Sequence, residues 1–149
     1  MSRHEACIRW ERTSETFGYE DFNREHEWRF PGGTSIAASA APDYSGDERC
    51  VDPEEALVAA IASCHMLTFL AICARKRLTV NRYTDEAVGR LETNDQGRLA
   101  VTRVELSPRI EFEEQQPDPD VIARLHESAH RACFIANSVK TEIVVNPAG

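Results

Sequence analysis

Apolar and polar residues alternate over two short segments near the N-terminus, around residues 7–10 and 26–30. Such alternation is typical of strands that bury one face. A Pro-Gly-Gly sequence at 31–33 closes the second segment as a turn, and residues 34–36 are expected to begin a third strand. Residues 41–51, with proline, glycine and charged side chains, are expected to form a loop. The first third of the chain is therefore predicted to contain two or three strands.

A long helix is predicted to follow this loop. Asp52 suits the N-cap, Pro53 suits the first helical position, and Glu55 stands where a capping box places its carboxylate. The helix is expected to continue to about Leu78.

Residues 56–74 of this helix carry no formally charged side chain over 19 positions. This length is sufficient to cross a bilayer, but six alanines and the polar Ser63, His65 and Thr68 favour a buried core helix instead. A chain this short has little material to cover such a helix on every side. A second copy of the chain is therefore expected to cover it, as a homodimer.

The second half of the chain shows strand and helix patterns in turn. Residues 86–93 are expected to pair as a hairpin with residues 98–113, across an Asn-Asp-Gln-Gly turn. A second helix is predicted to begin at Pro119 with Asp118 as its N-cap, and a last strand is expected at 139–145. This order of elements predicts an α+β fold.

Composition and charge narrow the possible functions. A length of 149 residues predicts one domain covering residues 1–149. The 17 Lys and Arg residues against 25 Asp and Glu give a net charge of −8, which would repel a phosphate backbone, so nucleic acid is not an expected partner. No apolar signal segment follows the N-terminal residues, which favours the cytoplasm. Five cysteines match no disulfide framework or paired zinc framework and are expected to be thiols.

Two of these cysteines, Cys64 and Cys133, lie on apolar helix faces. Cys64 has apolar neighbours at helical spacing, and an inert core cysteine is the common fate of such a residue. Cys73 is nine residues further along the same helix, ~13.5 Å by helical rise, which is too far for a disulfide with Cys64. Cys133 ends the apolar face of the second helix. Cys64 and Cys133 are therefore the pair that helix packing could bring together.

A competing motif lies in the second helix. His126, Glu127 and His130 satisfy the H-E-x-x-H pattern, in which two imidazoles on one helix face bind zinc and the carboxylate acts as general base. No third histidine follows at zincin spacing, so a third ligand would have to be Glu142 or come from elsewhere. A zinc-dependent hydrolase is one alternative. The other interpretation is two solvated histidines on the polar side of an amphipathic helix.

Residues 52–64 read Asp-Pro-Glu-Glu-Ala-Leu-Val-Ala-Ala-Ile-Ala-Ser-Cys. This segment resembles the Asn-Pro-Glu-Glu/Gln-Leu-x-x-Ala-x-x-Ala-Ala/Ser-Cys sequence of the OsmC/Ohr family, the osmotically inducible and organic hydroperoxide resistance proteins. A second similarity is the helix that ends at Cys133, followed by a short polar turn and a final strand. The resemblance implies an OsmC-like fold, with two antiparallel-rich β-sheets around long central helices in an intertwined homodimer.

The resemblance further implies a thiol peroxidase that reduces organic hydroperoxides to alcohols without a cofactor. By this resemblance Cys64 is the peroxidatic cysteine, which forms a sulfenic acid, and Cys133 is the resolving cysteine, which forms a disulfide with it. An external dithiol, of lipoyl type or another thiol, would then reduce the disulfide. Glu54 stands at the acidic position of the family. Arg24, with Arg29 as the alternative, is expected to supply the family's arginine.

Distance limits how these groups can meet. Glu54 and Cys64 are ten residues apart, ~15 Å along a straight helix, so one guanidinium cannot touch both in a single chain. We therefore expect Glu54, Arg24 or both to reach Cys64 from the partner chain.

The chain departs from the family pattern beside each cysteine. Phe134 follows Cys133 where the family usually has proline, and His65 follows Cys64 where the family usually has an apolar residue. A noncatalytic OsmC-like stress or binding protein, whose cysteines never meet an oxidant, is a further alternative.

Overall fold

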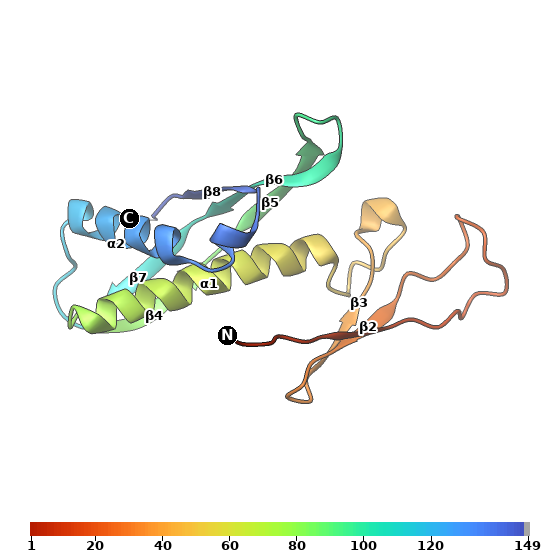
Figure 1. Ribbon diagram of the computed structural model, residues 1–149, viewed down its shortest axis with the longest axis horizontal. Coiled ribbons are helices and arrows are strands. Elements are labelled where there is room, and N and C mark those ends of the chain that lie inside the picture. Colours follow the sequence, from red (N-terminus) through yellow and green to blue (C-terminus); the bar gives the residue numbers. More distant parts are fainter. Residues whose placement is uncertain (148–149) are drawn as a thin grey trace. The chain divides into compact units, whose positions relative to one another are not determined.

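The computed structural model describes residues 1–147 (Figure 1). The chain divides into two compact units, Met1–Ala56 and Leu57–Gly149. Each unit is described by itself below, and the single domain expected from chain length stays a prediction.

The first unit is built on a three-stranded antiparallel sheet in the order β1-β2-β3. These strands confirm the ones predicted near the N-terminus, and they are β1 Cys7–Arg9, β2 His26–Arg29 and β3 Ser35–Ala38, of which β1 is exposed at all three positions. Ile8 and Ile36 both lie opposite Trp28 of the central strand. The turn before β3 is possible because Gly33 takes φ 91°, a conformation that glycine adopts without steric penalty.

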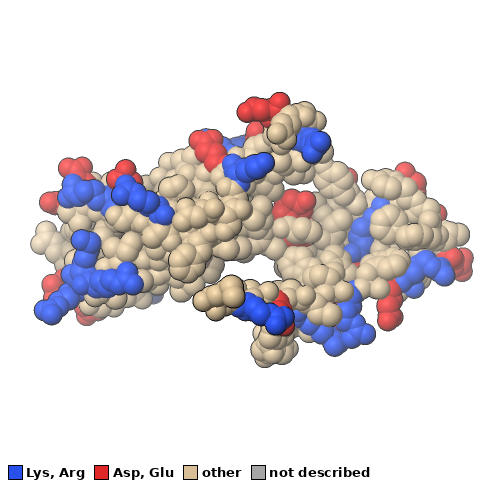
Figure 2. Space-filling model, in the orientation of Figure 1, with Lys and Arg blue, Asp and Glu red and all other residues tan. Residues whose placement is uncertain are grey.

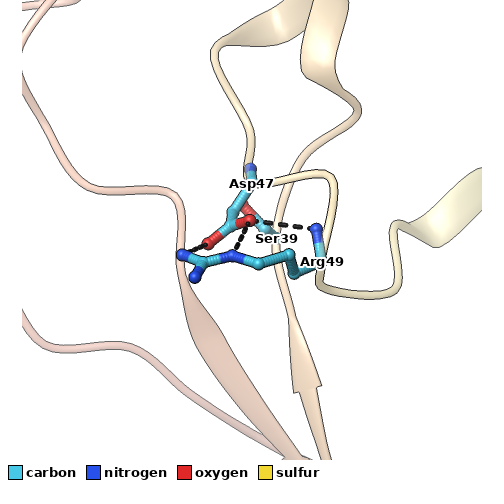
Figure 3. A network of polar contacts seen from close by, with 3 residues as sticks. All are labelled: Ser39, Asp47 and Arg49. Atoms are coloured by element: carbon cyan, nitrogen blue, oxygen red, sulfur yellow. Dashed lines mark hydrogen bonds and ion pairs between the residues drawn. The ribbon is translucent and has the colours of Figure 1, made fainter.

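A polar network shapes the loop that leads from β3 to the long helix (Figure 3). The Asp47 amide donates to the hydroxyl of buried Ser39 at 3.1 Å, and the Arg49 guanidinium binds both carboxylate oxygens of Asp47 at 3.0 and 2.8 Å. These bonds from Arg49 lower the pKa of Asp47 to about 2. Gly46 is required at this turn, because a Cβ there would lie 1.6 Å from the carbonyl oxygen of Ala40.

Helix α1, Pro53–Arg75, begins as predicted. The Glu55 amide donates to the Asp52 carboxylate at 2.8 Å and the Asp52 amide donates to Glu55 at 3.0 Å, which confirms the capping box. The helix ends three residues before the expected Leu78. There the chain reverses through Arg77, whose φ is 60°, and the Leu78 amide bonds a carbonyl of the last turn.

Five strands of the second unit form two sheets. A two-stranded sheet pairs β4 with β7, and a three-stranded sheet has the order β5-β6-β8, in which β6 and β8 are parallel. The strands are β4 Val80–Asp85, β5 Val88–Thr93, β6 Leu99–Leu106, β7 Pro108–Phe112 and β8 Glu142–Val145.

The predicted hairpin is therefore only partly correct. β5 does pair with β6, but residues 98–113 are two strands in different sheets, and the partner of the second is β4, which the sequence pattern did not predict. The break falls at Ser107, whose amide donates to the Asp85 side chain at 2.7 Å instead of to a strand, and the next residue, Pro108, has no amide hydrogen to donate. The alternation of apolar residues continues across Ser107, so the sequence pattern did not indicate that the strand ends there.

Helix α2, Pro119–Ala132, begins at the predicted residue, but the Asp118 side chain makes no cap hydrogen bond. A short 3-10 turn, Ala136–Ser138, precedes β8, which makes the last strand shorter than predicted. Two buried clusters hold α1 in this unit. One contains Phe69, Cys73, Leu125 and Ala129, and the other contains Ile61, Val104 and Leu106.

Much of α1 remains uncovered in a single chain. Its most apolar 18-residue window has a mean hydropathy of 2.1 but is only 22% buried, and Leu67 is 60% exposed. By length and composition α1 could cross a membrane. In Figure 2 the surface along this part of the second unit shows few charged side chains. The predicted homodimer would cover this surface, and the dimer itself stays a prediction.

Candidate active site: two thiols on packed helices

Cys64 and Cys133 lie close together in the second unit, near enough for each thiol to shift the pKa of the other. Cys64 is half-buried in the middle of α1, and Cys133 is buried at the C-cap of α2. The Cys133 thiol donates to the Cys64 sulfur. Cys64, Cys133 and the other three cysteines are all free thiols. Of the residues predicted for the site, these two are the pair that the structure brings together.

The chain after Cys133 turns sharply and directs backbone amides at the two sulfurs. The amides of Phe134 and Ile135 face Cys64 closely enough to lower the pKa of its thiol. The amide of Ala136 donates to the Cys133 sulfur at 3.4 Å. Consecutive backbone amides directed at one atom favour a negative charge there. These donors belong to the backbone, and no side-chain pattern in the sequence indicates them.

The two thiols have opposite pKa shifts. Burial raises the pKa of Cys64, but hydrogen bonds from Cys133 and from the amides of Ile135 and Phe134 outweigh burial and bring this pKa below its usual value. The Thr68 hydroxyl makes the smallest contribution to this lowering of the pKa, and it donates to the Cys64 carbonyl at 2.8 Å. Burial and donation to Cys64 raise the pKa of Cys133. Cys64 is therefore the thiol that ionises first.

The other predicted site residues belong to the first unit. Arg24 donates to the carbonyl of Tyr19 at 2.6 Å, and its guanidinium carbon lies 3.6 Å from the centroid of the Phe22 ring. Arg29 pairs with Glu27. No ion pair within residues 1–147 involves Glu54. The participation of Glu54, Arg24 or Arg29 in the site stays a prediction.

A second pair of side chains, which the sequence did not predict, joins the same two helices. His65 of α1 and His126 of α2 are 1% and 3% exposed, and their Nε2 and Nδ1 atoms are 3.0 Å apart. Their rings are nearly parallel, at 8°, and His126 also stacks on Phe69 with centroids 4.4 Å apart. His126 precedes Cys133 by seven residues, two helical turns, and this spacing could have placed it on the buried face.

Both imidazoles are neutral near pH 7. Burial lowers the pKa of His126 to about 4. Burial, followed by the charges of His126 and His130, lowers the pKa of His65 to about 4. The outer nitrogens, His65 Nδ1 and His126 Nε2, have no hydrogen-bond partner among the described residues.

The zinc alternative is not supported by this geometry. His126 is buried against α1 while His130 is exposed, so the prediction of two solvated histidines is wrong for His126. Glu142, considered as a third ligand, pairs with Arg103 at 3.2 Å. Residues 1–147 contain no group of three or more His, Cys, Asp or Glu side chains placed to hold a metal ion.

A cleft of about 810 Å³ lies elsewhere in the second unit, between the β5–β6 hairpin and residues 139–142. Neither Cys64 nor Cys133 lines it. Its walls mix acidic, basic and hydroxyl side chains and contain no cysteine or histidine. The contact between the thiols, and not this cleft, therefore marks the candidate active site.

Residues 46–148 match the family model of OsmC-like proteins. The chain belongs to the OsmC-like protein family. This match includes both thiols and both histidines of the pair, and it confirms the resemblance seen in residues 52–64. A search of curated protein sequences finds no significant match to the chain.

Solved structures show the same OsmC-like fold. An OsmC-like protein of unknown function from Vibrio cholerae is 45% identical with a TM-score of 0.95, over 99% of this chain and 100% of that one. An organic hydroperoxide resistance protein from Legionella pneumophila is 13% identical with a TM-score of 0.73, over 99% and 96% of the two chains. The organic hydroperoxide resistance protein OhrB of Bacillus subtilis is 10% identical with a TM-score of 0.68, over 99% and 98%. The last two likenesses concern the fold alone.

Proposed function

We propose that this OsmC-like protein is a thiol-dependent peroxidase that reduces organic hydroperoxides to alcohols. The observation that carries the proposal is that Cys64 and Cys133 lie together and that their pKa values shift in opposite directions. A peroxidase of this kind needs one cysteine that is ionised and attacks the peroxide, and a second that stays protonated until the first has been oxidised. Membership of the OsmC-like family, together with the fold shared with proteins named for organic hydroperoxide resistance, led us to this reaction class.

The reaction begins at the Cys64 thiolate. Its sulfur attacks the terminal oxygen of the hydroperoxide, the O–O bond breaks, and the alkoxide leaves and takes up a proton to become the alcohol. The sulfur loses two electrons and becomes a sulfenic acid. The backbone amides of Phe134 and Ile135 stabilise the attacking thiolate through hydrogen bonds that do not depend on a titrating side chain.

Cys133 completes the oxidative half of the cycle. Its sulfur displaces the hydroxyl of the Cys64 sulfenic acid, which forms a disulfide and releases water. An external dithiol, of lipoyl type or another thiol, exchanges with this disulfide, restores both protein thiols and is itself oxidised. Such a cycle requires a reducing compartment, and the cytoplasm is the proposed location.

Apolar side chains beside the thiols favour an organic hydroperoxide over hydrogen peroxide. Leu67, one turn beyond Cys64, is 60% exposed, and Phe134, next to Cys133, is 80% exposed. Ile61, one turn before Cys64 on the same helix, is buried in the core and does not contribute to this surface. Leu67 and Phe134 are thus the residues proposed to contact the organic group.

The proposed enzyme is a homodimer in which Glu54, Arg24 or both approach the partner's thiols. Burial opposes ionisation of Cys64, and a guanidinium held by a carboxylate would lower its pKa further. The exposed apolar surface of α1 supports an association of two chains.

Counting of thiols tests this function directly. One equivalent of cumene hydroperoxide should remove two of the five thiols, and mass spectrometry should locate the new disulfide between Cys64 and Cys133. Cys73→Ser is the matched control, since Cys73 lies on the same helix, and it should give the same loss of two thiols. A wild-type protein that keeps all five thiols would contradict the proposal and favour a noncatalytic OsmC-like protein.

A further inference from the structure

We propose that the His65–His126 pair is a positioning device that sets Cys64 and Cys133 within bonding reach. The inference rests on the proposed disulfide between these two thiols. His65 and His126 touch neither sulfur through any hydrogen bond in the described residues, and their effect is exerted through the relative placement of α1 and α2.

The imidazole contact and the thiol contact join the same two elements. Cys64 and His65 are consecutive on α1, and Cys133 follows His126 by seven residues at the end of α2. A displacement of α2 along α1 that separated the imidazoles would therefore also displace Cys133 relative to Cys64. A disulfide forms only when the two Cα atoms are about 4.4–6.8 Å apart. A shift of one helical turn, ~5.4 Å, would abolish this geometry.

Stability alone does not account for two histidines at this place. The pair forms one hydrogen bond, at 3.0 Å, but leaves His65 Nδ1 and His126 Nε2 buried without partners in the described chain. Unpartnered buried nitrogens are unfavourable, and two apolar side chains could pack there without that penalty. A hydrogen bond is directional and depends on both distance and angle, whereas apolar contacts are non-directional. The pair therefore provides a fixed position that the surrounding apolar cluster does not.

The surrounding contacts support this role. His126 is held by stacking on Phe69, which itself meets Tyr83 of β4 edge to face, with ring centroids 5.7 Å apart. The neighbouring contacts between the helices come from Phe69, Cys73, Leu125 and Ala129, which form no hydrogen bond through their side chains. Among the described residues, the side chains of α1 and α2 thus make polar contact with each other at the imidazole pair and at the thiols.

The test measures how strongly the folded chain favours the Cys64–Cys133 disulfide. The full-length protein is equilibrated with reduced and oxidised dithiothreitol, and the disulfide is quantified by peptide mass spectrometry. The equilibrium constant reports the effective concentration of one thiol at the other. His126→Phe keeps an aromatic ring on Phe69 but removes the hydrogen bond. His126→Asn places an amide where Nδ1 was and can restore the bond to His65.

The matched control is Leu125→Ala. Leu125 precedes His126 in the same buried cluster, so its truncation destabilises the packing of α1 and α2 without removing either polar contact. Thermal unfolding of each variant shows whether it is folded and how much stability it has lost. His65→Gln, which preserves a donor or acceptor where Nε2 was, serves if His126→Phe does not fold.

We expect His126→Phe to lower the equilibrium constant about tenfold, His126→Asn to recover most of it, and Leu125→Ala to stay within about twofold of wild type despite a lower melting temperature. An unchanged constant in His126→Phe, or an equal loss in Leu125→Ala, would overturn the inference. Hydroperoxide takes no part in this equilibrium. Failure of the proposed function would instead appear as wild-type protein that does not react with cumene hydroperoxide.

Discussion

Two segments of the same helix, around Cys64 and around Cys73, show what separates a reactive thiol from an inert one. Burial raises the pKa of both. At Cys64 a neighbouring thiol and two backbone amides donate hydrogen bonds and reverse that effect, whereas at Cys73 burial acts alone. Both cysteines lie in the uncharged stretch of residues 56–74. The difference in pKa therefore comes from the chain after α2, which supplies hydrogen-bond donors to Cys64 but not to Cys73.

Removal of the sulfur from each segment should give the largest contrast. Cys64→Ser is expected to reduce steady-state peroxidase activity to the uncatalysed rate, because serine cannot form the sulfenic acid. Cys73→Ser should retain full activity. Consumption of cumene hydroperoxide with an excess of dithiol measures both variants. Turnover in Cys64→Ser comparable to wild type would remove the distinction between the two segments.

Removal of the neighbouring thiol should stop the cycle after one event. Cys133→Ser is expected to consume one equivalent of hydroperoxide and then stall or overoxidise, because Cys64 sulfenic acid has no resolving partner. A sulfenic acid reagent such as dimedone should label Cys64 in this variant and should label wild type weakly. Continued turnover with an unlabelled Cys64 would show that Cys133 has no resolving role.

The pKa difference itself can be measured by alkylation. The lowered pKa of Cys64 means that its thiolate appears as pH rises through a value below the usual one for cysteine, so its rate of reaction with iodoacetamide should rise at lower pH than that of an unfolded cysteine. Cys73, with a raised pKa and 1% exposure, should stay unmodified until the protein unfolds. Peptide mass spectrometry distinguishes the two sites. Equal pH profiles at Cys64 and Cys73 would contradict the comparison.

The histidine pair, which lies between the two cysteine segments, should make stability depend on pH. Both imidazoles have a folded pKa of about 4 against an ordinary value of 6.5, so the unfolded chain binds more protons between these values. Stability is then fully present above pH 6.5 and falls as pH decreases toward 4. We expect the melting temperature to fall by roughly 5 to 10 °C over this range. In His126→Phe the decrease should be smaller, and an unchanged decrease would show that other groups cause it.

Local signals in the sequence predicted the local structure well. The Asp52–Glu55 capping box, the three N-terminal strands and the start of α2 are where the pattern placed them. Each depends on residues close in sequence, whose interactions are the same in many folds. The strand pairing of residues 98–113 was predicted only in part, because the Asp85 side chain, which binds the Ser107 amide where the β5–β6 ladder ends, comes from β4.

The amino-acid sequence by itself determined where α1 and α2 run, that Cys64 and Cys133 occupy apolar helix faces, and which family the chain resembles. Only the tertiary structure decided that backbone amides lie near one sulfur, that His126 is buried against His65, and that burial acts on Cys73 without a donor among the described residues. The physical reason is that periodicity records which side of a helix is buried, while a pKa depends on the donors and charges that other elements bring within a few ångströms.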